Sequence, residues 1–228
     1  MGVRAIGMRA ILATALILLP GVASAGAWPR EAGETFLSFS HALSAPRGDW
    51  GTAGFDPGTW TALYLEHGVG GGLTFGLDVG RSDDGAATVI GFASVALGQG
   101  AGGGRWAAQM GVGGTGPEGP DRPLVQVMAM WGRGSAAGWL AADGQVLLVR
   151  DAPAIAKLDL TWGLNTGDRT RVIVQLQAGD YPGSPPYARL HPSLVLRLSD
   201  RMSIELGGEL GLVGSDSLGL KLGTWLEF

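Results

Sequence analysis

Hydrophobic and polar residues alternate strictly along the last segment of the chain. Leu218, Leu220, Leu222, Leu226 and Phe228 have one parity, and Gly219, Lys221, Gly223 and Glu227 have the other. A β-strand with this period of two has one apolar face and one polar face. Because the alternation continues to the last residue, the segment predicts a strand between hydrocarbon and a wet interior.

Comparable segments of about ten residues recur along the chain, separated by turn-forming residues. One of them, Ala87–Leu97, is apolar on both faces, so its orientation stays open. The pattern predicts an all-β fold, with ten strands as the alternative to twelve. The twelve predicted strands are Glu34–Leu43, Gly58–His67, Gly72–Arg81, Ala87–Leu97, Gly104–Gly113, Pro123–Gly132, Gly138–Val149, Ala154–Leu164, Thr170–Gly179, Arg189–Ser199, Met202–Leu212 and the closing segment.

The connections between these segments alternate in length, as in a transmembrane antiparallel up-and-down β-barrel. An even number of strands places both chain ends on the side of the shorter turns, which is the periplasmic side in such barrels. The predicted periplasmic turns are His67–Gly71, Gly98–Gly103, Arg133–Ala137, Asn165–Arg169 and Asp200–Met202. The predicted outer loops, several of them longer and rich in Pro, are Ser44–Pro57, Ser82–Ala86, Gly114–Arg122, Arg150–Pro153, Asp180–Ala188 and Val213–Ser217.

The first 25 residues have the pattern of a cleaved signal peptide. Arg4 and Arg9 precede an apolar run from Ala10 to Leu19, and Ala23-Ser24-Ala25 fits the small-x-small cleavage rule. A transmembrane helix would need about 20 apolar residues, which is about twice the length of this run. We therefore expect residues 1–25 to be removed and residues 26–228 to form a single barrel domain that begins with Gly26.

Composition limits the partners and cofactors. The chain has 16 Lys and Arg against 20 Asp and Glu, so its net charge of −4 provides no basic field for nucleic acid. It has no Cys, which excludes disulfides and thiolate metal sites, and only 3 His. The 41 Gly residues disfavour helices. No cofactor and no metal site is expected.

These features together resemble the outer-membrane β-barrel proteins of Gram-negative bacteria, whose last strand ends in Phe. The resemblance is to the class and covers the whole mature chain. It implies a location in the outer membrane, contact with outer-membrane lipid and lipopolysaccharide, and assembly by periplasmic chaperones and the barrel-insertion machinery, which would read Phe228 as its signal. It names no substrate and no specific protein partner.

A soluble β-sandwich or lipocalin is the alternative fold, because its strands also alternate, with the apolar face inward. Three features favour the membrane barrel. They are the signal peptide in a chain without Cys, the terminal Phe228, and the apolar stripes that continue over so many strands.

The polar parity predicts which residues line the lumen. Because their charges are balanced, no strong ion preference is expected. The predicted lining residues are Asp78, Arg105, Gln109, Asp143, Gln145, Lys157, Asp159, Arg171, Gln175, Gln177, Arg197, Glu205, Glu209 and Lys221.

The turn lengths predict two cross-strand ion pairs, since residues directly opposite each other share a face. A three-residue turn at Asp200–Met202 would set Arg197 opposite Glu205. A loop centred on Ser215 would set Glu209 opposite Lys221.

Tryptophans are expected near the membrane interfaces, where aromatic girdles form. Trp225 has lumen parity, so an interior position is its alternative. The tryptophans near predicted strand ends are Trp28, Trp60, Trp131, Trp139, Trp162 and Trp225.

A hydrolase is the enzymatic hypothesis, since some barrels of this size place a His with Ser, Asn or Asp near the outer rim. His41 and His191 lie near outer strand ends, and Asp83, Asp84 and Asp180 are close to that rim. However, His41 has lipid-face parity, His191 precedes a Pro at a loop–strand junction, and the chain shows no active-site motif of such enzymes. We predict no catalytic residue, and we interpret the acidic segment 82–85 as a turn rather than a Ca²⁺ site.

Two functions remain. The favoured one is a narrow, weakly selective channel for small polar solutes. In the alternative, the lumenal charges pair and close the barrel, which then acts as a structural or accessory envelope protein through its loops or partners.

Overall fold

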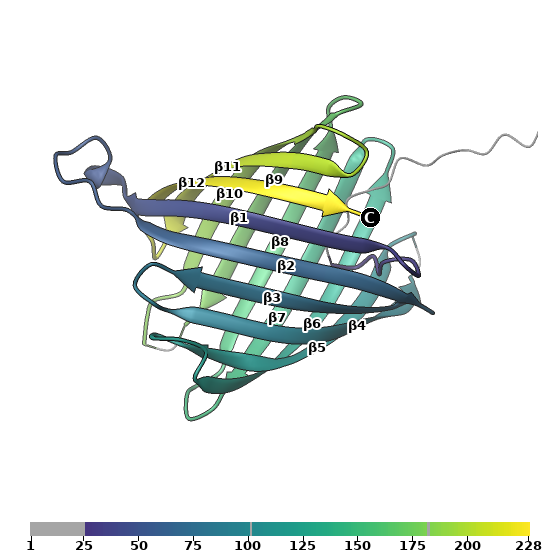
Figure 1. Cartoon of the computed structure of the whole chain (residues 1–228), viewed down its shortest axis with the longest axis horizontal. Coiled ribbons are helices and arrows are strands. Elements are labelled where there is room, and N and C mark those ends of the chain that lie inside the picture. The colour runs from purple at the N-terminus through teal and green to yellow at the C-terminus, as the bar shows by residue number, and fades with distance from the viewer. Residues whose placement is uncertain (1–25, 101, 182) are drawn as a thin grey trace, which may run out of the picture.

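Twelve antiparallel strands close into one barrel in the computed structural model, which describes residues 26–100, 102–181 and 183–228 (Figure 1). The predicted signal peptide lies outside the described residues. All twelve predicted strands are present, and their bounds differ from the prediction by no more than three residues. They are β1 (Thr35–Pro46), β2 (Gly58–Gly70), β3 (Leu73–Ser82), β4 (Ala87–Gln99), β5 (Arg105–Gly116), β6 (Arg122–Ser135), β7 (Gly138–Val149), β8 (Ile155–Asn165), β9 (Thr170–Asp180), β10 (Tyr187–Arg197), β11 (Met202–Val213) and β12 (Ser217–Glu227).

The barrel closes between its first and last strands. β1 pairs with β12 over eleven residues, from Phe36 opposite Glu227 to Pro46 opposite Ser217. Beyond the last pair, the Thr35 amide donates to the Phe228 carbonyl at 3.0 Å, and the Phe228 amide donates to the Thr35 carbonyl at 2.9 Å. The terminal residue therefore completes the seam, and no strand edge is left unpaired.

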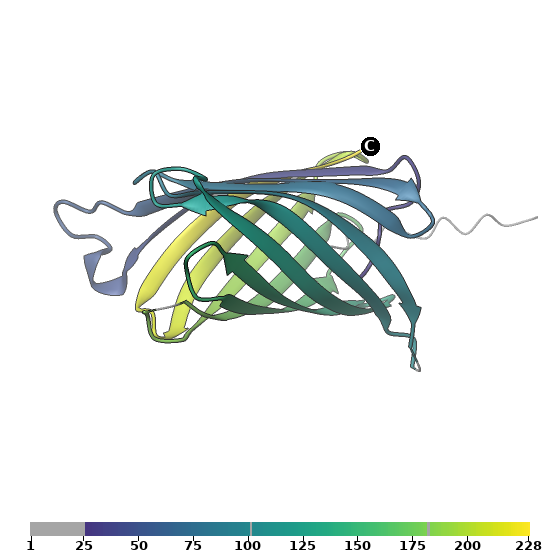
Figure 2. The same ribbon diagram turned by 90° about the horizontal axis from the view of Figure 1, so that it is seen from below.

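The two ends of the barrel differ in their connections. The connections at the end that carries the C-terminus have two to five residues, and those at the opposite end have three to eleven (Figure 1). The β1–β2 connection contains a 3-10 helix, η1 (Arg47–Asp49), and projects beyond the strands (Figure 2). Within the described ranges, no helix is long and apolar enough to span a membrane.

The outer wall of the barrel is apolar. Met110 and Val112 of β5, Leu206 of β11, and Leu220 and Leu222 of β12 are all more than half exposed. In water such a surface would be costly, at about 25 cal/mol per Å² of apolar area, whereas in a bilayer it contacts hydrocarbon. The opposite parity faces the lumen.

The interior is not uniformly polar. Ile90 and Phe92 of β4, Leu124 of β6, and Leu147 and Val149 of β7 form a buried apolar cluster. This cluster settles the orientation of β4, because Val95 and Leu97, on its other parity, are 42% and 64% exposed on the outside. On β4, β6 and β7 the lumen therefore has an apolar part, and polar side chains line other parts of the same strands.

Both predicted cross-strand ion pairs are wrong by two residues. Arg197 lies opposite Ser203, and Glu205 lies opposite Val195. Lys221 lies opposite Gly207, and Glu209 lies opposite Gly219. The β10–β11 turn is closed by the Leu198 amide, which donates to the Met202 carbonyl at 2.8 Å. A shift of two residues keeps each side chain on its predicted face, so the alternation could not reveal it.

Candidate functional site

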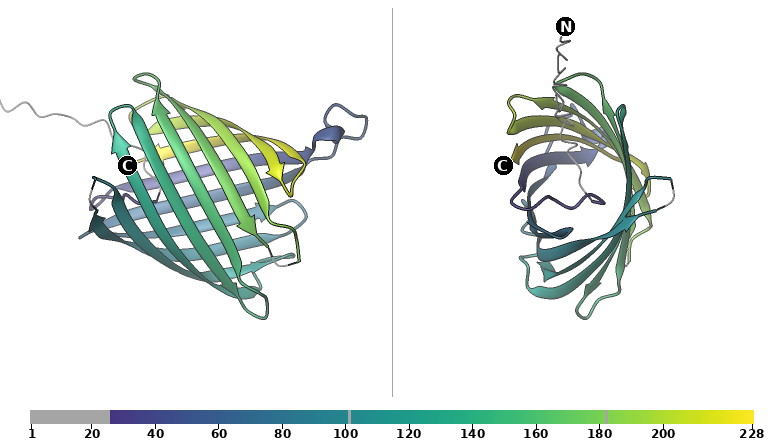
Figure 3. Two further views of the ribbon diagram at one scale, coloured as in Figure 1. Left: turned by 180° about the vertical axis from the view of Figure 1, so that it is seen from behind. Right: turned by 90° about the vertical axis from the view of Figure 1, so that its right-hand side faces the viewer.

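The lumen contains a stretch of chain that belongs to no strand. We call residues 26–34 the N-terminal segment; it precedes β1 and crosses the opening at the end that carries the C-terminus (Figure 3, right). Ala27 is fully buried against Ala107 of β5 and Met130 of β6. The segment then reaches β2, where the Gly33 amide donates to the Gly68 carbonyl at 2.8 Å. It therefore narrows this end of the barrel.

Trp28 packs the segment against the wall at a glycine. A Cβ on Gly132 of β6 would lie 2.2 Å from the Trp28 ring, which is closer than atoms can approach. Two positions further along the same face, a Cβ on Gly134 would lie 3.9 Å from the ring, at ordinary contact distance. Only glycine at position 132 admits the indole in this place.

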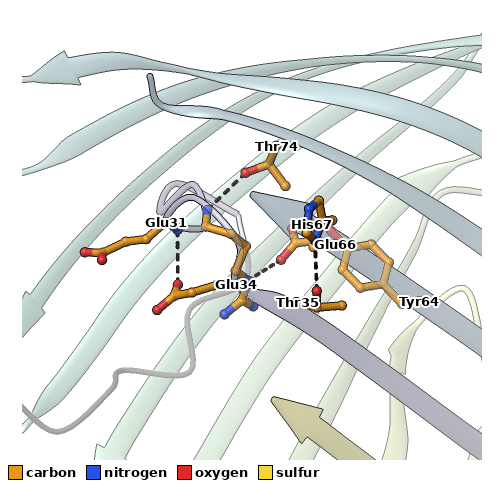
Figure 4. A network of polar contacts seen from close by, with 8 residues as sticks. Glu31, Glu34, Thr35, Tyr64, Glu66, His67 and Thr74 are labelled. Carbon is orange, nitrogen blue, oxygen red and sulfur yellow. Dashed lines mark hydrogen bonds and ion pairs between the residues drawn. The ribbon is translucent and has the colours of Figure 1, made fainter. Parts of the chain in front are cut away.

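Arg30 anchors the segment to β2 and β3 through a buried ion pair. Its Nε donates to Glu66 Oε2 at 2.8 Å, with side-chain exposures of 10% and 7%. The backbone amide of Arg30 donates to the hydroxyl of Thr74 at 3.0 Å, and Tyr64 donates to the other Glu66 oxygen at 2.7 Å. Figure 4 shows Glu66 between Tyr64 and the N-terminal segment. Every oxygen of this buried carboxylate is satisfied, so the pair stabilises the segment in its place.

An aromatic row continues from this anchor along the inner wall. The rings of Trp225 and Phe36 lie 6.0 Å apart edge to face, and those of Phe36 and Tyr64 lie 6.4 Å apart. Tyr64 then stacks on Phe92 at 5.6 Å. Arg30 covers the Phe36 ring at 4.6 Å. The row lines the lumen from β12 to β4 with rigid, bulky side chains.

Three glutamines form a hydrogen-bonded ladder on the next part of the wall. Gln109 Nε2 donates to Gln126 Oε1 at 2.9 Å, and Gln126 Nε2 donates to Gln145 Oε1 at 2.9 Å. Gln126 was not among the predicted lining residues, although its parity in β6 would have placed it there.

The strands β10 to β12 carry a wall of paired charges. Lys221 Nζ donates to Glu205 Oε1 at 3.1 Å, and the Trp225 indole donates to Glu205 Oε2 at 3.1 Å. Glu209 lies 3.5 Å from Arg189 and 3.9 Å from His191. Glu205 and Glu209 thus have basic neighbours, but Lys221 and Arg189 are diagonal to them and are not the partners that the turn lengths predict.

The other predicted lining residues also lie on the inner parity. Arg197 donates to the Asp168 carbonyl in the β8–β9 turn, and Gln177 donates to Gln175 at 3.0 Å. Lys157 lies 5.3 Å over the Tyr181 ring. Asp159 lies directly opposite Asp143. The inward parity also holds Asp78 and Arg171, and Arg105 is exposed at the end of its strand.

Among the described residues, neither His41 nor His191 makes an ion pair or a hydrogen bond with Asp83, Asp84 or Asp180, the carboxylates of the hydrolase hypothesis. His41 hydrogen-bonds Thr61 at 2.9 Å on the outer face. His191 lies inside and approaches Glu209, whose Oε1 accepts from Ser217 at 2.6 Å. The Glu209 carboxylate lies between the Ser217 hydroxyl and the His191 imidazole. His191 therefore cannot take the proton of Ser217, as a general base must.

The acidic segment 82–85 satisfies its own polar groups. The Ser82 hydroxyl and the Ala86 amide both donate to the Asp84 carboxylate, and these bonds lower the pKa of Asp84. Thr59 donates to Asp83 at 3.2 Å. Among the described residues, no three His, Asp or Glu side chains gather as metal ligands.

The tryptophans divide between the two faces, which corrects the expectation of a girdle for Trp28 and Trp139 and agrees with the interior alternative for Trp225. Trp106 and Trp162 are about half exposed on the outer wall, at 48% and 51%, near the end that carries the C-terminus. Trp28, Trp139 and Trp225 lie inside.

On the outer face, Trp106 and Trp131 flank a shallow apolar groove over Ala142, Gly144 and Leu158, with a volume of about 360 Å³.

No family model and no curated protein sequence matches this chain. Several solved structures share its fold. An outer-membrane channel from Pseudomonas putida F1 superposes with a TM-score of 0.63 at 11% identity, covering 90% of this chain and 99% of that one. A KdgM porin gives 0.62 at 9% identity, covering 84% and 99%. Outer membrane phospholipase A from Escherichia coli, an active-site mutant, gives 0.51 at 12% identity, covering 87% and 91%.

At these identities the likeness concerns the fold, and both channels and an enzyme share it. Together with the closed, even-stranded barrel and its apolar outer wall, it defines the fold: this chain is a twelve-stranded antiparallel β-barrel of the kind found in these outer-membrane proteins.

Proposed function

We propose that the protein is a narrow, weakly selective channel for small polar solutes across the outer membrane. The observation that carries the proposal is the wall of charges inside a barrel whose outside is apolar. Lys221, Glu205, Arg189 and Glu209 all face the lumen. Lys221 and Arg189 keep 36% and 37% of their side chains exposed although each has an acidic partner, so this wall favours a hydrated interior.

The narrowness follows from the N-terminal segment and the aromatic row. Trp28 and Arg30 lie at the end of the lumen that carries the C-terminus, and the aromatic row lines the wall from Phe36, at the start of β1, to Tyr64 and Phe92, in the middle of β2 and β4. A solute must pass between these groups and the charged wall. Both signs of charge lie on that wall, so a strong preference for cations or anions is not expected.

The comparisons support this proposal without naming a solute. The Pseudomonas putida structure is described as an outer membrane channel and the KdgM structure as a porin. In our proposal the chain reaches the outer membrane after removal of residues 1–25, and the insertion machinery recognises the closing strand through Phe228.

The test is the conductance of the refolded mature protein in a planar bilayer, with folding verified by its heat-dependent gel shift. We expect discrete, repeatable openings and a reversal potential near zero in a KCl gradient. A folded protein that conducts with a strong preference for one ion would contradict weak selectivity.

A non-conducting accessory barrel is the second candidate, and the N-terminal segment favours it. The Arg30–Glu66 pair and the packing of Trp28 fix an obstruction in the opening. For this candidate the refolded protein would stay silent, and a partner protein would co-purify with it from membranes.

A further inference from the structure

A carboxylate oxygen in the lumen has no partner among the described residues. Oδ1 of Asp143, on β7, is buried and accepts no hydrogen bond from any residue that the structure describes. Asp159 lies directly opposite it on β8. Two like charges facing each other across a strand pair are destabilising, and a carboxylate oxygen that is buried without a hydrogen bond adds to the cost. A cation beside Asp143 would stabilise both carboxylates.

The nearby basic side chains are directed elsewhere. Arg30 pairs with Glu66 on β2, and Lys157 lies over the Tyr181 ring. In the described part of the chain, no ion pair includes Asp143 or Asp159. The cation must come from another group.

Gly26 lies directly against this carboxylate. A Cβ on Gly26 would lie 2.6 Å from Asp143 Oδ1 and 3.0 Å from Oδ2. The backbone nitrogen is bonded to the same Cα, so it lies within about 6 Å of Oδ1. Gly26 is also the residue with which the mature chain is predicted to begin.

We infer that the Asp143 carboxylate is the binding site for the α-ammonium group of the processed chain. Water hydrolyses the Ala25–Gly26 peptide bond in the signal peptidase, leaving a carboxylate on Ala25 and an ammonium on Gly26. Before cleavage the nitrogen is a neutral amide with one hydrogen. Afterwards it carries a positive charge and three donors, which is what an unpaired buried carboxylate requires.

Processing then completes the attachment of the N-terminal segment. Trp28 and Arg30 hold the segment at β6 and β2, and the ammonium adds a third anchor at β7. The segment is fully fixed across the lumen only in the mature protein. This inference rests on the predicted cleavage site and not on conduction. Its test is therefore independent of the test of the proposed channel.

The test measures the reactivity of the α-amino group in protein exported by cells and purified in detergent. Intact mass first establishes the mature start, and any first residue other than Gly26 overturns the inference. The folded protein is then labelled with an amine-reactive reagent near neutral pH, and the N-terminal peptide is quantified by mass spectrometry. An ammonium held by a carboxylate is seldom in the neutral form that reacts.

Asp143→Asn removes the charge at nearly constant size, and Asp180→Asn, in the exposed end of β9, is the matched control. We expect the N-terminus of the Asp143→Asn protein to react about tenfold faster than those of the parent and of the control. Equal rates in all three overturn the inference.

A second variant keeps Asp143 and leaves every strand unchanged. Gly26→Ala would place a methyl group against the carboxylate and force the N-terminus away, so faster labelling is again expected. A Gly26→Ala protein that reacts as slowly as the parent contradicts the proposed geometry.

Discussion

At the scale of single residues, the contact between Gly132 and Trp28 determines how the N-terminal segment fits the wall. In Gly132→Ala, the new methyl group would overlap the indole and displace it. We expect amide hydrogen exchange in residues 26–33 to become about tenfold faster, which corresponds to about 1.4 kcal/mol of lost local stability. Hydrogen-exchange mass spectrometry of the folded protein measures this.

Gly134→Ala is the matched control, because its Cβ would lie at ordinary distance from the same ring. If both variants exchange like the parent, Trp28 is not what fixes the segment.

Lys221 and Glu205 determine the local charge of the lumen. In Lys221→Met, Glu205 loses its basic partner, keeps the hydrogen bond from the Trp225 indole and remains buried. Because Lys221 is partly exposed, we expect a loss of about 1–3 kcal/mol rather than the full cost of breaking a buried pair. The free energy of unfolding from urea titration in detergent measures it.

The double variant Lys221→Met with Glu205→Gln removes both charges and should recover most of this loss. A double variant as unstable as the single one would show that the two residues are not coupled.

At the scale of elements, the β10–β11 register can be tested with introduced cysteines, since the chain has none of its own. Residues directly opposite lie about 5 Å apart, within reach of a disulfide, whereas diagonal neighbours lie about 7–8 Å apart. We expect Arg197→Cys with Ser203→Cys to oxidise readily, and Arg197→Cys with Glu205→Cys to oxidise poorly. If non-reducing gels show more disulfide in the Arg197→Cys, Glu205→Cys pair than in the Arg197→Cys, Ser203→Cys pair, the register predicted from the sequence is correct.

The last strand offers a test of assembly. Phe228 exchanges two backbone hydrogen bonds with Thr35, at 3.0 and 2.9 Å, and so closes the seam between β1 and β12. We expect deletion of Phe228 to lower the yield of folded barrel in the outer membrane, measured by the heat-dependent gel shift of membrane fractions. Deletion of Thr52 and Ala53, in the projecting β1–β2 loop, is the control. Normal assembly without Phe228 would show that it is not the signal.

The strands themselves were predictable because lipid and lumen impose opposite chemistry on alternate residues. In β3, Leu73, Phe75, Leu77 and Val79 alternate with Thr74 and Asp78, and the strand was found where predicted. In β4 the pattern left the orientation open, because Ile90 and Phe92 pack in an apolar part of the lumen. Where both faces of a strand carry apolar side chains, the alternation does not show which face meets lipid and which meets the lumen.

Two features of the structure could not be predicted from the sequence. The register of β10 and β11 depends on the closure of one turn, and a slip of two residues leaves every parity unchanged. The N-terminal segment has no periodicity, and its partners lie on β2, β3, β5, β6 and β7. Glu66, its main anchor, was not predicted as a lining residue, although its parity within β2 was a usable signal.

At the scale of the whole molecule, the lumen has two unlike walls and an obstructed end. An apolar cluster on β4, β6 and β7 lies beside a glutamine ladder, and a wall of paired charges follows β10 to β12. The N-terminal segment crosses the opening beside the aromatic row. In our account, water and small solutes pass along the charged wall, and the segment limits their size.

The most direct test compares two proteins in the same planar bilayer. One is the mature protein, and the other lacks residues 26–33 and carries Glu66→Gln, so that no buried carboxylate is left without Arg30. Provided that both show the heat-dependent gel shift of a folded barrel, we expect small, discrete openings from the first and severalfold larger openings from the second. If both are folded and both stay silent, the lumen is not a pore and the account is wrong.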